Sequence, residues 1–67
     1  MTEDDVDAFV GITVEQARAL DPWRATRLLK GALRTLQRKG RITAERTVRL
    51  VEEIKQVVKR GKDPRRN

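Results

Sequence analysis

Apolar residues recur along this chain at spacings of three and four, the repeat of one face of an α-helix. The longest such segment begins at Pro22, after Asp21, and continues to about Lys39, just before Gly40. Asp is a favoured N-cap, Pro suits the first helical position, and Gly commonly follows a helix end. The pattern therefore predicts a helix over residues 22–39. Its apolar side consists of Ala25, Leu28, Leu29, Ala32, Leu33 and Leu36.

A second long helix is predicted over residues 44–60, with Thr43 as its N-cap and Gly61 at its end. Its apolar residues cover a broad arc, wider than one antiparallel neighbour needs. These residues are Val48, Leu50, Val51, Ile54, Val57 and Val58.

The short connection between the two long helices predicts an antiparallel helical hairpin. Before it, the sequence predicts two short helices, over residues 3–10 and 14–20. Thr2 and Thr13 are their expected N-caps, and Gly11 is the expected stop between them. The predicted class is all-α, with the short helices lying across the hairpin. The wide apolar arc is then covered by this N-terminal segment or by a second copy, so we also expect a homodimer that forms a helical bundle.

The length of 67 residues suits one domain, and we place it at residues 1–61. Residues 62–67 are expected to form a mobile basic tail. The 17 Val, Ile, Leu and Phe residues make up about a quarter of the chain, above the level of roughly a fifth typical of disorder. There is no cysteine, so disulfides cannot reinforce so small a core. Oligomerisation is the reinforcement that remains open.

The net charge of +6 is unevenly distributed. Residues 1–21 carry six acidic side chains and one arginine, whereas residues 22–67 carry fifteen basic and four acidic side chains. Such asymmetry indicates an anionic partner, an acidic arm, or both. No apolar run approaches the roughly 18 residues of a membrane span, and the chain does not open with a signal-peptide pattern. We therefore expect a cytoplasmic protein that does not bind membranes.

The composition argues against catalysis, because the chain contains no Ser, Cys, His or Tyr from which to build the usual nucleophile and base pairs. Glu3, Asp4, Asp5 and Asp7 match neither an EF-hand nor a phosphate-loop pattern. Carboxylates in a first helical turn favour the positive end of the helix dipole, and we interpret them in that way. We expect no enzymatic activity, no metal, no cofactor and no small-molecule substrate.

The predicted helix over residues 22–39 carries cations, and no acids, on the side opposite its leucines. We call this set the basic ridge: Arg24, Arg27, Lys30, Arg34 and Arg38. A ridge roughly 20 Å long can neutralise several phosphates, and arginine suits bidentate phosphate contacts. Arg41 is expected to add to it. The alternatives are an acidic protein surface or a solvated helix face. A solvated face usually mixes signs, as in the last helix, where Arg49 can pair with Glu45 and Glu53.

Trp23 precedes the basic ridge in the first turn of the same helix. Beside arginines it could stack on a base or anchor a protein interface. The other interpretation is that Trp23 folds back over Phe9 and Leu20 and seals the N-terminal core. We expect the second, because a core poor in aromatic residues gains most from its largest side chain.

These patterns lead to a hypothesis of a small regulatory or architectural protein that binds DNA or RNA as a homodimer. The alternative is a protein-interaction module, such as an accessory subunit or a phage-type regulator, that binds an acidic or apolar surface. In that case Val51, Ile54 and Val58, within the wide apolar arc, are the candidates for contact and self-association.

Overall fold

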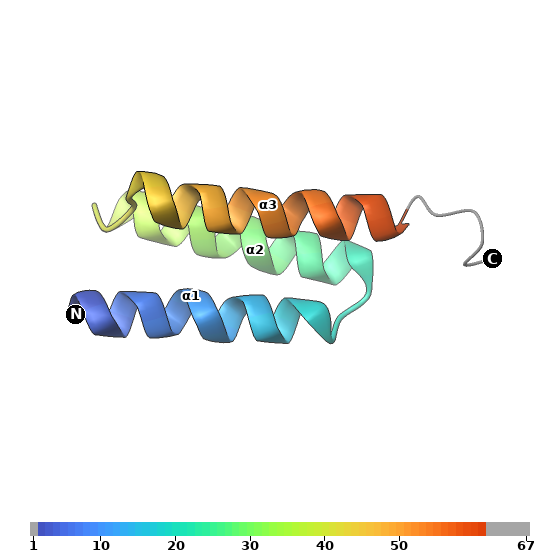
Figure 1. Ribbon diagram of the computed structural model, residues 1–67, viewed down its shortest axis with the longest axis horizontal. Helices are drawn as coiled ribbons and strands as arrows, with labels where there is room; N and C mark the ends of the chain where they lie inside the picture. Colours follow the sequence, from blue (N-terminus) through green and yellow to red (C-terminus); the bar gives the residue numbers. More distant parts are fainter. Residues whose placement is uncertain (1, 62–67) are drawn as a thin grey trace.

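The computed structural model describes residues 2–61, and over that range it consists of three α-helices (Figure 1). These are α1 (Glu3–Arg18), α2 (Pro22–Arg38) and α3 (Ala44–Gly61). Helix α2 runs antiparallel to α1 and α3 (Figure 1). The all-α class and the two long helices are thus confirmed to within a residue or two at their ends. The predicted tail, residues 62–67, lies outside the described residues.

The N-terminal segment is one helix of 16 residues, so the prediction of two short helices over 3–10 and 14–20 was wrong. Gly11 stays within the helix, and Thr13 is not a cap, because its hydroxyl donates to the Phe9 carbonyl at 2.7 Å. Val6 and Ala17 mark the ends of a buried stripe that passes Gly11 without interruption. Burying that stripe outweighs the cost of about 1 kcal/mol for a glycine inside a helix.

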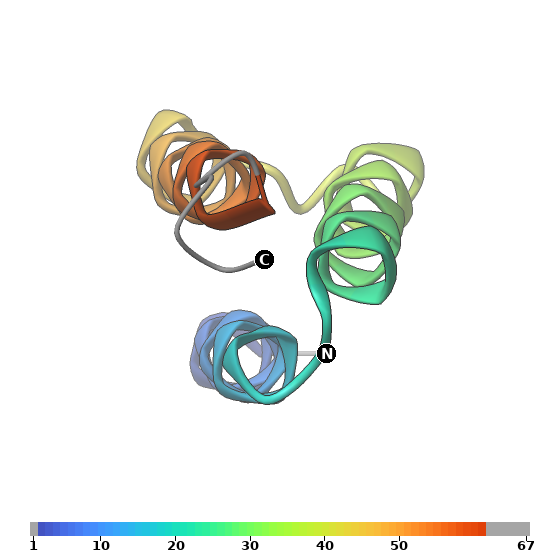
Figure 2. The same cartoon turned by 90° about the vertical axis from the view of Figure 1, so that its right-hand side faces the viewer.

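Helix α1 runs alongside the hairpin, and the expectation that the N-terminal segment lies across it was also wrong. The end-on view shows the three helices at the corners of a triangle (Figure 2). A continuous helix of 16 residues can run along the hairpin in one direction, whereas two short helices separated by a bend would take two directions.

Local signals set where the helices begin and where α2 ends. Thr2 and Asp5 form a reciprocal capping box at α1, and the Arg24 N–H donates to the Asp21 carboxylate at α2 at 3.2 Å. At α3 the Arg46 N–H donates to the Thr43 hydroxyl at 3.2 Å. Gly40 follows α2 with φ +69°, a left-handed conformation that favours glycine. The sequence predicted Thr2, Asp21 and Thr43 as N-caps and Gly40 as the end of α2. It did not predict that Asp5 completes the capping box of α1.

All three helices contribute to the buried core, which lies along the centre of the triangle. Phe9, Leu20, Leu28, Leu33 and Ile54 are half-buried against it. Helix α1 therefore covers the apolar side of the hairpin within one chain. The fully buried members are Val6, Val10, Val14, Ala17, Ala25, Leu29, Leu36, Leu50 and Val57.

Polar side chains also join the helices. The Arg18 guanidinium donates to the Glu53 carboxylate at 2.7 Å, and this bond raises the pKa of Arg18 above its usual value. Arg60 donates to the Leu20 carbonyl at 3.0 Å. Glu53 on α3 thus pairs with Arg18 on α1. The predicted pairs of Arg49 with Glu45 and Glu53 were wrong, because no such ion pair is present within residues 2–61.

Candidate nucleic-acid interface

The basic ridge occupies the solvent side of α2. Arg24, Arg27, Lys30, Arg34 and Arg38 are all exposed. The opposite side of the helix is buried through Ala25, Leu29, Ala32 and Leu36. The α2 segment contains no acidic residue. Packing of the leucines therefore fixes the direction in which the cations point.

The cations of the basic ridge are largely unpaired. Arg24 lies 3.5 Å from the Asp21 carboxylate, and both side chains are mostly exposed. The other four have no acidic partner within 4.0 Å among residues 2–61. An exposed pair such as Arg24 with Asp21 contributes little stability and opens easily. The whole ridge can therefore accept an external anion.

Arg41, which the sequence grouped with the basic ridge, lies in the loop between α2 and α3. Its guanidinium is 3.7 Å from the Glu3 carboxylate, and its carbonyl accepts a hydrogen bond from Arg46 at 2.8 Å. The structure thus brings Arg41 to the start of α1, where an acid already partly neutralises it. The candidate site on α2 therefore consists of the five cations of the basic ridge.

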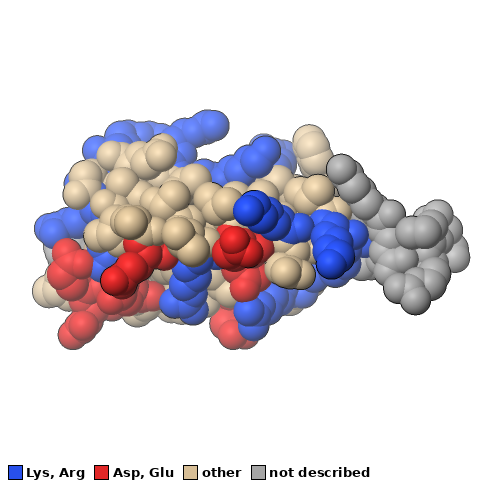
Figure 3. Space-filling view, turned by 45° about the horizontal axis from the view of Figure 1, so that its top comes forward, with Lys and Arg blue, Asp and Glu red and all other residues tan. Residues whose placement is uncertain are grey.

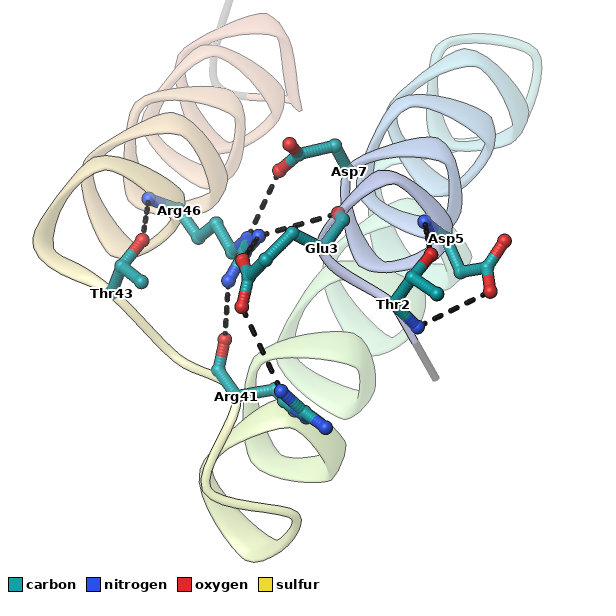
Figure 4. A network of polar contacts seen from close by, with 7 residues as sticks. All are labelled: Thr2, Glu3, Asp5, Asp7, Arg41, Thr43 and Arg46. Atoms are coloured by element: carbon teal, nitrogen blue, oxygen red, sulfur yellow. Dashed lines mark hydrogen bonds and ion pairs between the residues drawn. The ribbon is translucent and has the colours of Figure 1, made fainter.

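Arg46 is the centre of a polar network that sequence reasoning missed (Figure 4). It is only 7% exposed, although it is an arginine on the first turn of α3. Its guanidinium donates to Asp7 at 3.0 Å and also to the carboxylate of Glu3. One signal was available, because Arg46 precedes Leu50 by four residues and therefore shares its buried side of the helix.

The environment of Arg46 keeps it cationic. Its hydrogen bond with Glu3 is the main cause that raises the pKa of Arg46 above the usual value; burial opposes this, and Asp7 adds to it. A groove of about 460 Å³ runs beside the network between the starts of α1 and α3. Glu3 and Asp7 line that groove but already pair with Arg46. Two of the acids near the chain start therefore have a structural role.

Acidic and basic side chains adjoin one another on α1 and α3, but acids are absent from α2. Figure 3 shows one group of carboxylates at the end of the molecule where α1 begins, further carboxylates beside cations at the centre and lower edge, and cations along the upper edge. Three acids, Glu3, Asp4 and Asp5, occupy the first turn of α1, whereas the first turn of α2 contains none. The basic ridge is thus free of interleaved negative charge.

Trp23 is 70% exposed, so the expectation that it folds back over Phe9 and Leu20 was wrong. The Arg27 guanidinium carbon lies 5.9 Å from the centre of its ring, within the range of a cation–π contact. Phe9 and Leu20 pack against the core without it. The indole is oriented this way because the second position of α2 lies well away from the leucine side.

The three residues suggested for self-association differ in their surroundings. Ile54 packs against the core, and Val51 is half-buried. Val58 is 39% exposed, and Val48, ten residues earlier on α3, is 59% exposed. The broad apolar arc is therefore mostly used within the chain, and Val48 and Val58 are its exposed members.

Comparison with known proteins adds no identification: no family model, curated protein or solved structure matches this chain. None of the helices described between residues 2 and 61 is long and apolar enough to cross a membrane.

Proposed function

We propose that this protein is a small non-enzymatic regulatory or architectural protein that binds nucleic acid through the basic ridge. One observation carries the proposal: an acid-free helix face exposes five cations, four of which have no acidic partner among the described residues. A face that served only for solubility would be expected to mix signs, as α3 does with its Lys55 and Glu52 pair.

The length of the basic ridge suits a phosphate backbone. Arg24 and Arg38 are separated by about 21 Å at about 1.5 Å per residue. Successive phosphates of a strand are several ångströms apart, so a straight ridge of this length can lie beside several of them at once. Arginines hold such phosphates through planar, bidentate hydrogen bonds.

Binding is expected to depend steeply on salt. Five phosphate contacts predict a slope of log affinity against log salt of about −3.5 for single strands and about −4.5 for duplex. Raising salt from about 50 to about 200 mM then weakens binding roughly 100- to 500-fold. Fluorescence anisotropy of labelled DNA and RNA, titrated at several salt concentrations, measures this slope.

The double variant Arg34→Gln/Arg38→Gln tests the ridge directly. Loss of two contacts is expected to weaken binding and to reduce the salt slope by about 1.4 to 1.8. The matched control is Lys55→Gln/Lys59→Gln, which removes the same charge from the exposed face of α3. Equal losses in the two double variants, or no binding of any nucleic acid at about 50 mM salt, would contradict the proposal.

A second candidate function is protein interaction, with a second copy of this chain as the partner. It is favoured by the exposure of Val48 and Val58, at 59% and 39%, on α3. The acidic first turn of α1 also offers a complement to the basic ridge of another copy. Light-scattering mass, measured over a range of protein concentrations, tests this candidate.

A further inference from the structure

We infer that Trp23 is a stacking platform for an unpaired base, and that the basic ridge therefore prefers single-stranded nucleic acid to duplex. The inference rests on the proposed function and names the substrate class of the same site. What carries it is the exposure of the indole beside the ridge, which packing within the chain does not explain.

The core does not use the indole. Trp23 is 70% exposed, while Phe9 and Leu20, the residues that it could have covered, are half-buried without it. Tryptophan has the largest apolar surface of any side chain, and burial of an aromatic residue is among the most favourable contributions to a small core. An indole left in water in a chain this poor in aromatic residues is consistent with a role in binding.

The neighbours of Trp23 are cations. Arg27 lies one turn further along α2, with its guanidinium carbon 5.9 Å from the ring centre. Arg24 adjoins it in the chain and is also exposed. Stacking aromatics beside a positively charged track are the usual means of binding single strands without sequence preference. Here the ring offers a surface to a base, and Arg27 and Arg24 offer charge to the flanking phosphates.

The same geometry discriminates against duplex. In a duplex each base is already stacked between its neighbours, so an indole can reach a base face only by unstacking a step, which costs a few kcal/mol. In a single strand the base is available without that cost.

Trp23 is the only tryptophan in the chain, so its own fluorescence reports on the site. We expect a single-stranded oligothymidylate long enough to cover the ridge to quench the emission, and a duplex of equal length to do so far less. Trp23→Ala should weaken single-strand binding roughly tenfold and change duplex binding by less than about twofold. Trp23→Phe should retain most of the single-strand affinity, because it keeps an aromatic face.

Three results would overturn the inference. The first is that Trp23→Ala binds single strands as tightly as the unaltered protein, while Arg34→Gln/Arg38→Gln binds them weakly. This result would leave the proposed function intact. The second is equal quenching by an abasic strand of the same length, since only phosphates are then sensed. The third is an emission shift with protein concentration alone, accompanied by a doubled mass, which makes Trp23 a contact between copies. Absence of all binding, by contrast, refutes the proposed function itself.

Discussion

Arg46 shows how one buried side chain links the ends of this small bundle. Its guanidinium contacts Asp7, the carboxylate of Glu3 and the carbonyl of Arg41, so it joins α1, α3 and the loop before α3. Its aliphatic stem is covered as well, because the residue is 7% exposed. Long charged side chains of this kind stabilise through packing as well as through charge.

We therefore expect Arg46→Ala to lower the midpoint of thermal unfolding clearly more than Arg49→Ala does. Arg49→Ala is the matched control, because it removes another arginine only three residues further along α3. Arg49 is exposed and has no ion pair within residues 2–61. Thermal unfolding followed by circular dichroism measures both. Equal midpoints for the two variants would show that the network of Figure 4 contributes nothing to stability.

The sign of the pH effect at Arg46 follows from its raised pKa. A cation whose pKa is higher in the folded state contributes its full stabilisation at all pH values below the unfolded pKa. That contribution is lost only as pH rises through the folded value. The Arg46 charge therefore does not itself make stability vary between pH 5 and 9, and a loss would begin only in strong alkali.

At the scale of the element, one glycine within α2 and one just after it have opposite roles. Gly31 is exposed within the helix, and an added Cβ there meets nothing within 4 Å. Gly40 follows the helix with φ +69°, a conformation that side chains with a Cβ adopt only at a cost. The two positions thus form a matched pair for one substitution.

We expect Gly31→Ala to raise the free energy of unfolding by about 0.5 to 1 kcal/mol, because it removes backbone freedom from the unfolded chain. Gly40→Ala should lower it by about 1 to 2 kcal/mol, because the left-handed conformation becomes strained. Urea denaturation at fixed protein concentration measures both. If both substitutions changed the free energy of unfolding in the same direction, Gly40 would not have the left-handed conformation described at the end of α2.

At the scale of the whole molecule, a single chain already buries the apolar side of its hairpin under α1 (Figure 2). Association between copies must then use residues left outside that core. Val48 and Val58 are the large apolar residues that α3 leaves most exposed.

If copies associate through α3, Val48→Lys/Val58→Lys should lower the light-scattering mass toward that of one chain and leave the helical circular dichroism unchanged. Charged ammonium groups at a shared apolar contact cannot be desolvated cheaply. The control is Ile12→Lys, which puts the same charge on an exposed apolar residue of α1 and leaves both valines in place. A mass of 7.7 kDa for the unaltered chain at all concentrations would rule out this association.

The sequence by itself determined those features of the candidate site that depend on a single segment of the chain. Asp21, Pro22 and Gly40 delimit α2, and its spacing of leucines and arginines fixes which side is buried. Both depend on residues within a few positions of one another, which is the range over which helix propensity, capping and periodicity act. The exposure of the basic ridge was predictable for that reason.

The tertiary structure alone decided that α1 continues past Gly11 and which residues Arg46 contacts. Both depend on partners distant in the chain: Arg46 is 39 residues from Asp7 and 43 from Glu3, and the buried stripe of α1 shares its core with α2 and α3. Helical periodicity states which side of a segment is apolar but not which other segment will cover it. Packing between helices supplies that information, because the free energy of burying a shared core exceeds the local cost of a glycine within a helix.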